Sequence, residues 1–160
     1  MIRFYVEKIS KHITLAEATK SQTAKRKGIN NEPDAYELQA MKLVAEKIFE
    51  PIREHFNVPI SVTSFFRSKR LNTAIGGSAT SQHCTGEAMD LDADVFGGVT
   101  NKEIFDYIKN NLEFDQLICE FPDSSGNPSW VHVSYSKINN RKQILKALKG
   151  DKRTIYLHYD

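Results

Sequence analysis

The chain has 160 residues, of which 40% are hydrophobic and 26% charged, a composition that fits one compact domain and excludes a disordered chain. Lys and Arg number 22 and Asp and Glu 20, so the net charge of +2 argues against a dedicated nucleic-acid binder. The 2 cysteines, Cys84 and Cys119, are too few for a disulfide framework. We expect free buried thiols, with a single bridge as the alternative.

The N-terminal third is expected to hold a short strand and one long helix. Alternating hydrophobic residues predict a strand over residues 2–6. Residues 10–32 are polar and basic, and residues 25–27 are interpreted as part of a solvated loop or helix end, with a weak grip on an anionic polymer as the alternative. Hydrophobic residues recur every three or four positions over residues 34–56, which predicts a helix with a kink at Pro51.

A strand, a short helix and a loop are expected next. Residues 58–66 alternate in the manner of a strand. Ser68 is a suitable cap for a short helix that ends near residues 76–77, where two glycines follow one another. Residues 78–87 are loop-like, and residues 88–92 return to extended structure.

The second half of the chain is expected to begin with a helix that Thr100 and Glu103 open as a capping box. Residues 116–121 are typical of a buried strand, and a turn-rich loop follows. Residues 130–135 form a further predicted strand. Because the connection is short, this strand is expected to pair antiparallel with residues 116–121.

The C-terminal segments are less specific. Residues 142–148 fit either a helix or a strand, and residues 154–158 are predicted to form a strand. Together these elements predict an α+β fold, with helices packed on a mainly antiparallel sheet. We expect residues 1–160 to form a single domain.

Three polar residues indicate a metal site. His83 and Asp90 flank a turn of small residues, and His132 sits in an otherwise apolar strand. Zinc accepts imidazole nitrogen and carboxylate oxygen at about 2.0–2.2 Å, and a catalytic site keeps a fourth position open. Spacing alone leaves alternatives open, namely a packed core histidine and a surface aspartate.

Two segments are more specific than the spacing. Residues 81–90 have the pattern Ser-x-His-x-x-Gly-x-Ala-x-Asp, and residues 130–133 read Trp-Val-His-Val. This combination resembles the zinc D-alanyl-D-alanine carboxypeptidase-like metallopeptidases, in particular their compact single-domain branch from bacteria and phages. Residues 64–82 resemble the approach of that family to its first ligand. The resemblance covers most of the chain, is most specific over residues 60–135, and implies the Hedgehog/DD-peptidase fold.

The resemblance implies a role for each matching residue. His83, Asp90 and His132 match the ligands of one zinc ion. Arg67 matches an arginine beside the substrate, where a guanidinium holds a peptide carboxylate or polarises the carbonyl under attack; a surface salt bridge is its alternative. Ser81 matches a serine that binds the substrate or orients His83, and a simple loop cap is the other interpretation.

One position departs from the family pattern. Many relatives carry the catalytic carboxylate three residues before the last histidine, where this chain has Ser129. We predict Glu120 as the general base, because an acid in an apolar strand needs a reason; a strand-end glutamate turned to solvent is the alternative. Trp130 either walls the substrate cleft or packs in the core. Asp92 and Asp94 are interpreted as exposed acids, with contacts to the ligands or ligation itself as alternatives.

The implied function is zinc-dependent hydrolysis of a peptide bond in the peptidoglycan stem or cross-link, either as an endopeptidase or as a D-Ala-D-Ala carboxypeptidase. Charged residues interrupt the start of the chain, so we expect cytoplasmic synthesis without a signal peptide, no membrane insertion and action at the cell wall. This favours a phage-type lysin that a holin releases. The peptidoglycan stem peptide is the expected partner of a monomer.

Two other classes of function stay open at this point. The chain could be a zinc-binding phage structural or binding domain without peptidase activity, which the Ser129 departure favours. Nucleic-acid binding through residues 25–27 and 142–152 is the third class. The modest net charge and the lack of interleaved aromatic and basic residues argue against it.

Overall fold

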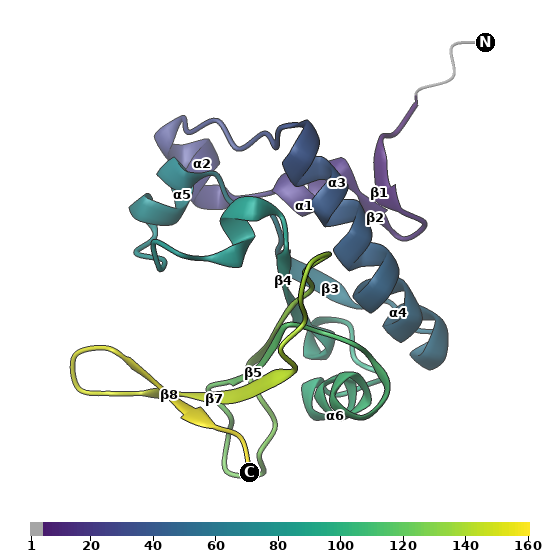
Figure 1. Cartoon of the computed structure of the whole chain (residues 1–160), viewed down its shortest axis with the longest axis vertical. Coiled ribbons are helices and arrows are strands. Elements are labelled where there is room, and N and C mark those ends of the chain that lie inside the picture. The colour runs from purple at the N-terminus through teal and green to yellow at the C-terminus, as the bar shows by residue number, and fades with distance from the viewer. Residues whose placement is uncertain (1–4) are drawn as a thin grey trace.

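The computed structural model describes residues 5–160, in which helices pack on a mainly antiparallel sheet (Figure 1). The strands are β1 (Lys8–Ser10), β2 (Ile13–Thr14), β3 (Ser61–Ser64), β4 (Ala88–Asp92), β5 (Gln116–Glu120), β6 (Trp130–Ser134), β7 (Gln143–Lys149) and β8 (Thr154–His158). The α-helices are α1 (Leu15–Thr19), α2 (Gln22–Lys27), α3 (Ala35–Val44), α4 (Glu50–Phe56), α5 (Lys69–Ala74) and α6 (Asn101–Asn111). A π-helical segment, η1 (Ala45–Phe49), and two 3-10 helices, η2 (Gln82–Thr85) and η3 (Ala93–Val95), complete the elements. The predicted α+β fold class is confirmed.

Six strands form the main sheet in the order β3-β4-β6-β5-β7-β8, and β1 pairs with β2 separately. Neighbouring strands of the main sheet run antiparallel, except that β5 and β7 run parallel. The expected antiparallel pairing of β5 with β6 is confirmed, with Ile118 opposite His132. The segment that fitted either a helix or a strand is the strand β7.

The two faces of the sheet differ in what covers them. Alternate residues of β4, β5 and β6 are almost completely buried in the core: Met89, Leu91, Leu117, Cys119, Val131 and Val133. Helix α3 contacts β4, and α6 contacts β5 and β6. Figure 1 shows α3, α4 and α6 on one side of the sheet. Since side chains alternate along a strand, the polar residues between the buried ones point to the opposite face. That face carries the candidate site.

The start of the chain differs from the expectation. The predicted strand over residues 2–6 falls partly on residues 1–4, which lie outside the described residues. Tyr5 and Val6 belong to no strand, and 90% and 58% of their surface is exposed. Among the described residues no strand pairs with Tyr5 or Val6, so hydrophobic alternation at these two positions does not produce a strand.

Residues 25–27, interpreted as part of a solvated loop or helix end, form the last turn of α2, and the polar segment around them also contains β2 and α1, which no sequence pattern predicted. Thr14 and Glu17 form a capping box on α1. The Ser21 side chain accepts a hydrogen bond from Ala24 N–H at the start of α2, and Gly28, with φ of 63°, ends that helix. Such caps stabilise short helices that lack a long hydrophobic stripe, so hydrophobic periodicity could not reveal them.

The long predicted helix is confirmed as the continuous run of α3, η1 and α4, and the disturbance expected at Pro51 takes the form of a π-helical segment. Glu50 N–H donates to the carbonyl of Ala45, five residues earlier. Pro51 has no N–H to continue the ordinary pattern, and a widened turn just before it accommodates the missing bond. No helix within residues 5–160 has the length and apolar character needed to cross a membrane.

Several predicted helix boundaries are confirmed and two segments are refined. The Ser68 side chain caps α5, and Thr100 with Glu103 forms the capping box of α6. The strand expected over residues 58–66 is shorter, because only β3 pairs with β4. The expected loop of residues 78–87 contains η2.

Asp115 ties four segments together just before β5. Its carboxylate accepts hydrogen bonds from Arg141 Nε at 2.8 Å, Arg141 N–H at 3.0 Å and Gln82 Nε2 at 2.9 Å. Its backbone N–H donates to the carbonyl of Ser134 at 2.8 Å. The hydrogen bonds from Arg141, against the opposing effect of burial, lower the pKa of Asp115 to about 2.

This cluster predicts a loss of stability in acid. The pKa of Asp115 is lower in the folded chain than the unfolded value of about 3.9, so its ionised form contributes about 2 kcal/mol to folding at neutral pH. That contribution should disappear as the pH falls from about 4 to about 2. Asp115→Asn should therefore destabilise the protein at pH 7 and have little effect at pH 2, as measured by urea unfolding. Asp151→Asn, at an exposed acid, is the control; an Asp115→Asn effect equal at both pH values would contradict the prediction.

Candidate active site

Three side chains from two separate segments of the chain converge on the open face of the sheet. His83 comes from η2, Asp90 from β4 and His132 from β6, and one ligand atom of each lies within 4.8 Å of the others. The pairing of β4 with β6 places Asp90 directly opposite His132. Asp90 Oδ1 lies 3.0 Å from His132 Nδ1 and 3.3 Å from His83 Nε2. The three predicted ligands are thus brought together.

The ring of His83 is oriented by the backbone. Its Nδ1 lies 2.7 Å from the carbonyl oxygen of Phe65, so Nδ1 carries the proton and donates it. The other nitrogen, Nε2, faces the cluster, where its lone pair is available to a cation once Nε2 carries no proton. This Nε2 is buried and has no hydrogen-bond partner among the described residues. Because an unsatisfied buried polar atom is costly, a bound cation is the group that this geometry fits.

The separations within the cluster suit a tetrahedral metal. Ligand atoms bound to zinc at about 2.0–2.1 Å lie roughly 3.3 Å apart in a tetrahedral arrangement. The separations of 3.0 Å and 3.3 Å between Asp90 Oδ1 and the two histidine nitrogens agree with that value. Burial opposes the ionisation of Asp90, but the charge of His83 and the hydrogen bond from His132 outweigh it and hold the pKa of Asp90 well below its usual range. Asp90 is therefore an anion over the working pH range, as a metal ligand must be.

The turn that carries His83 depends on Ser81 and Gly86. The Ser81 hydroxyl accepts a hydrogen bond from His83 N–H at 3.3 Å, so Ser81 is a cap of η2. Gly86 ends η2 with φ of 75°, and a Cβ there would lie only 2.5 Å from the carbonyl oxygen of Glu37. The glycine of the sequence motif is thus required because the turn packs directly on α3.

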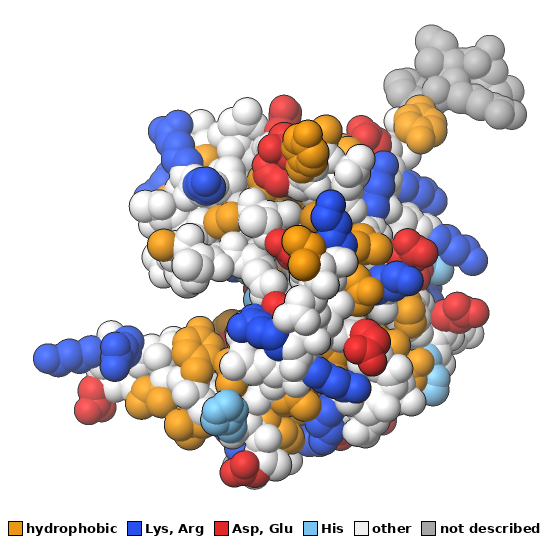
Figure 2. Space-filling view, viewed as in Figure 1, with side chains coloured by type: hydrophobic (Ala, Val, Ile, Leu, Met, Phe, Trp, Pro, Cys, Tyr) orange, Lys and Arg blue, Asp and Glu red, His pale blue; other side chains and the backbone are white. Residues whose placement is uncertain are grey.

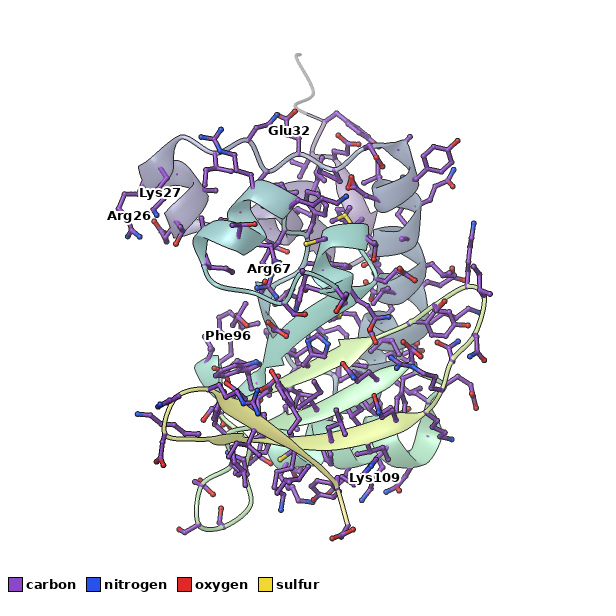
Figure 3. The ribbon with its side chains drawn as sticks, turned by 60° about the vertical axis from the view of Figure 1, so that its left-hand side comes forward. Arg26, Lys27, Glu32, Arg67, Phe96 and Lys109 are labelled. Carbon is purple, nitrogen blue, oxygen red and sulfur yellow. The ribbon has the colours of Figure 1, made fainter. Side chains whose placement is uncertain are left out.

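Arg67 lies beside the cluster on a loop that two backbone contacts fix. Arg67 N–H donates to the carbonyl of His83 at 3.2 Å. Asn31, which is buried, donates to the carbonyl of Phe66 and accepts from Ser68 N–H, and so holds the residues on both sides of Arg67. Arg67 Nε is buried without a partner among the described residues, and Figure 3 shows Arg67 between the helical part and the sheet. The surface salt bridge considered for Arg67 is absent among residues 5–160.

Glu120 shares the open face with the cluster. It lies opposite Trp130, and Ile118 lies opposite His132, so Glu120 and His132 are diagonal neighbours on adjacent strands. Only 7% of Glu120 is exposed, which excludes the interpretation of a glutamate turned to solvent. Burial raises the pKa of Glu120 to about 7, assisted by the charge of Asp90 and opposed by that of His132. A carboxyl group with such a pKa can both accept and deliver a proton near neutral pH.

Ser129 supports the turn that follows Glu120. Its hydroxyl donates to the carbonyl of Phe121 at 2.9 Å, and its N–H donates to the carbonyl of Glu120 at 2.8 Å. Phe121 has φ of 46°, an unfavourable backbone conformation for a bulky residue, and its ring lies 5.3 Å from that of Trp130. Ser129 thus holds the strained turn beside the candidate base.

The remaining acids and cysteines are explained by other contacts. Asn101 Nδ2 donates to Asp92 Oδ1 at 2.9 Å and to Asp94 Oδ2 at 3.1 Å, which fixes the start of α6. Neither aspartate belongs to the metal-binding cluster. Cys84 and Cys119 are both free, and Cys119 is buried on the core side.

Two cavities meet at the cluster. The larger, of about 880 Å³, is lined by His83, His132, Glu120 and Trp130 among others, so Trp130 is a wall of the cleft. The smaller, of about 530 Å³, lies along all four residues of β3. Arg67 and Asp90 border both cavities. Figure 2 shows the molecule hollowed between the part that holds α2 and α5 and the β7–β8 hairpin.

Sequence reasoning missed several residues of this site. Asn31 holds the loop that carries Arg67 by accepting a hydrogen bond from Ser68 N–H, and Gln82 anchors the turn that carries His83 to Asp115. No sequence motif marks either residue. Tyr156 lines the larger cavity from β8. Its only signal in the sequence is its place in an alternating strand at the far end of the chain.

Comparison with known proteins gives a match over most of the chain. Residues 11–134 match a family model described as Peptidase M15. Search of curated proteins finds no significant match. The matched residues contain the whole His83–Asp90–His132 cluster and the two residues predicted to act in catalysis, Arg67 and Glu120.

The cluster predicts that zinc binds and stabilises the folded protein. Adding zinc at a hundredfold excess over its dissociation constant should stabilise the chain by about 2.7 kcal/mol, because the ion binds the folded form. His132→Ala should lose this effect, since it removes one ligand at a partly exposed position. Thermal unfolding with and without zinc, together with metal analysis, measures both. His158→Ala, outside the cluster, is the control; zinc stabilisation of His132→Ala equal to that of the wild type would contradict the assignment.

Proposed function

We propose that this chain, which belongs to the peptidase M15 family, is a zinc-dependent peptidase that cleaves a peptide bond in the stem or cross-link of bacterial peptidoglycan. Family membership supports a metallopeptidase, and zinc is the metal on which the family depends. The observation that carries the proposal is the buried Glu120 beside the His83–Asp90–His132 cluster in one cleft. A site that only binds zinc has no need for a buried acid next to it.

The residues of the cleft divide the chemistry among them. A zinc ion on the cluster, when bound, supplies an electrophilic centre and activates water for attack on the peptide carbonyl. Glu120 accepts a proton during the attack and delivers it to the leaving amine, which its pKa of about 7 permits in both directions. The Arg67 guanidinium, whose buried Nε has no partner within residues 5–160, donates to the peptide carbonyl or to a substrate carboxylate.

The shape of the cleft favours an endopeptidase. A carboxypeptidase needs a site that ends just beyond the cleaved bond, whereas a chain cut internally must extend on both sides. The two cavities lie on either side of Arg67 and Asp90, so there is room for substrate in both directions. The sequence favours a phage-type lysin. Lysis requires cleavage within the peptidoglycan network, which is also the activity of an endopeptidase. We propose a monomer that acts on the stem peptide and not on nucleic acid.

A zinc-binding domain without peptidase activity was the alternative that Ser129 favoured. Ser129 supports the turn after Glu120 by donating a hydrogen bond to the Phe121 carbonyl. Although Ser129 cannot act as a base, Glu120 supplies an acid in the same cleft. The proposal predicts that the protein cleaves purified cell wall, and the alternative predicts that it does not.

Digestion of purified sacculi tests the proposed function. The zinc-loaded protein should release peptide-bond cleavage products, identified by mass, and a chelator should stop the reaction until zinc is restored. Internal fragments would support the endopeptidase, and release of terminal D-alanine alone would support the carboxypeptidase instead. Zinc binding with no cleavage at all would reject the proposal in favour of the non-catalytic domain.

Glu120→Gln should reduce the rate of cleavage by about 10²–10⁴-fold, the usual contribution of a general acid–base, while zinc content stays at the wild-type level. The amide has nearly the same shape, but it cannot accept the proton. Initial rates on solubilised peptidoglycan fragments and metal analysis of the same samples measure the two effects. Glu54→Gln, on the exposed side of α4, is the matched control. A Glu120→Gln variant within twofold of the wild-type rate would show that another group is the base.

A further inference from the structure

The β7–β8 hairpin builds one wall of the catalytic cleft, although it lies beyond the matched family region. That region ends at residue 134, and the hairpin begins at Gln143. Gln143 and Leu145 on β7 and Thr154 and Tyr156 on β8 all line the same cavity as His132 and Glu120. Their spacing of two shows that these four residues lie on one face of the hairpin, the face that points into the cleft. Figure 1 shows the hairpin reaching out from the sheet on the open side.

The strand register puts Tyr156 in line with the candidate base. Glu120 pairs with Trp130 on one side and with Ala147 on the other, and Ala147 pairs with Tyr156. These four residues therefore form a row across the open face. Adjacent strands are about 4.8 Å apart, so Glu120 and Tyr156 are separated by roughly 10 Å of sheet, which only the methyl group of Ala147 occupies. A tyrosine ring is long enough to lean over most of that distance.

Tyr156 has the features of a ligand-binding side chain. Of its surface 54% is exposed, and its hydroxyl has no hydrogen-bond partner among residues 5–160. Ala147, next to it in the row, is completely buried, so the neighbouring side chains close over it. The pKa of Tyr156 is raised by burial and by the charges of Glu120 and Asp90, which agrees with a phenol that faces the cluster. At neutral pH this hydroxyl is protonated and can donate a hydrogen bond.

We propose that the β7–β8 hairpin is a substrate-binding arm, in which the Tyr156 hydroxyl donates a hydrogen bond to a backbone carbonyl of a peptide that lies across Glu120. This inference rests on the proposed peptidase function, and it identifies the surface that binds the peptide substrate. The arm binds the peptide between Trp130 and Tyr156, the aromatic residues at the two ends of the row. Tyr156 is thus a substrate-binding residue and takes no part in proton transfer.

Kinetics of Tyr156 variants test this arm. Tyr156→Phe removes only the hydroxyl, so KM for a soluble muropeptide prepared from sacculi should rise about three- to tenfold, with kcat within twofold of the wild type. Tyr156→Ala also removes the ring and should raise KM further. Ile155→Ala is the matched control, because Ile155 is exposed on the same strand and alternates to the other face. Zinc content and thermal unfolding of each variant show that the cluster and fold are intact.

A binding measurement separates this inference from the proposed function. The single tryptophan of the chain, Trp130, lines the cleft, so its fluorescence reports the muropeptide binding to zinc-loaded Glu120→Gln protein. Adding Tyr156→Phe should weaken binding by the same three- to tenfold factor. Unchanged KM and unchanged binding in the Tyr156 variants would overturn the arm, even if the wild type digests sacculi. Binding that depends on Tyr156 without any digestion by the wild type would overturn the peptidase and leave the arm standing.

Discussion

The antiparallel register of β4 and β6 is the constraint on which the site depends. It sets Asp90 opposite His132, and it sends both side chains to the face that the helices leave open. A slip of one residue in either strand would turn its ligand into the hydrophobic core. His83 joins them from outside the sheet, on a short turn whose ring position is fixed by the Phe65 carbonyl. The metal-binding geometry is therefore determined by backbone pairing and needs little from flexible side chains.

Two carboxylates in one cleft take opposite states because their surroundings differ. Asp90 lies between two imidazoles and stays ionised, whereas burial raises the pKa of Glu120 to about 7. This difference supports the proposed roles, which are ligation for Asp90 and proton transfer for Glu120. Arg67 adds a cation that no acid neutralises within residues 5–160. The cleft thus holds an anion and a titratable acid on neighbouring parts of the sheet and a cation on an adjacent loop.

Sequence reasoning succeeded where a local signal was sufficient. The capping box of Thr100 and Glu103 marked α6, and two short motifs were enough to mark all three residues of the cluster. It recognised residues 25–27 only as a loop or helix end and did not predict α1 and α2, because helices of five or six residues show no hydrophobic period. It also missed Asn31 and Tyr156. Their roles arise from contacts between segments far apart in the chain, and no local pattern encodes the parallel pairing of β7 with β5.

The parallel pairing of β7 with β5 limits where the chain can be truncated. Without β7, the outer strand of the sheet would be β5, with the N–H and C=O groups of its free edge open to other chains. Four of the five residues of β5 are buried in the complete protein. A fragment cut back to the region shared with the family would therefore expose an apolar, unprotected edge and tend to aggregate. The hairpin is in this sense a cover for the peptidase sheet, and any minimal catalytic unit has to retain it.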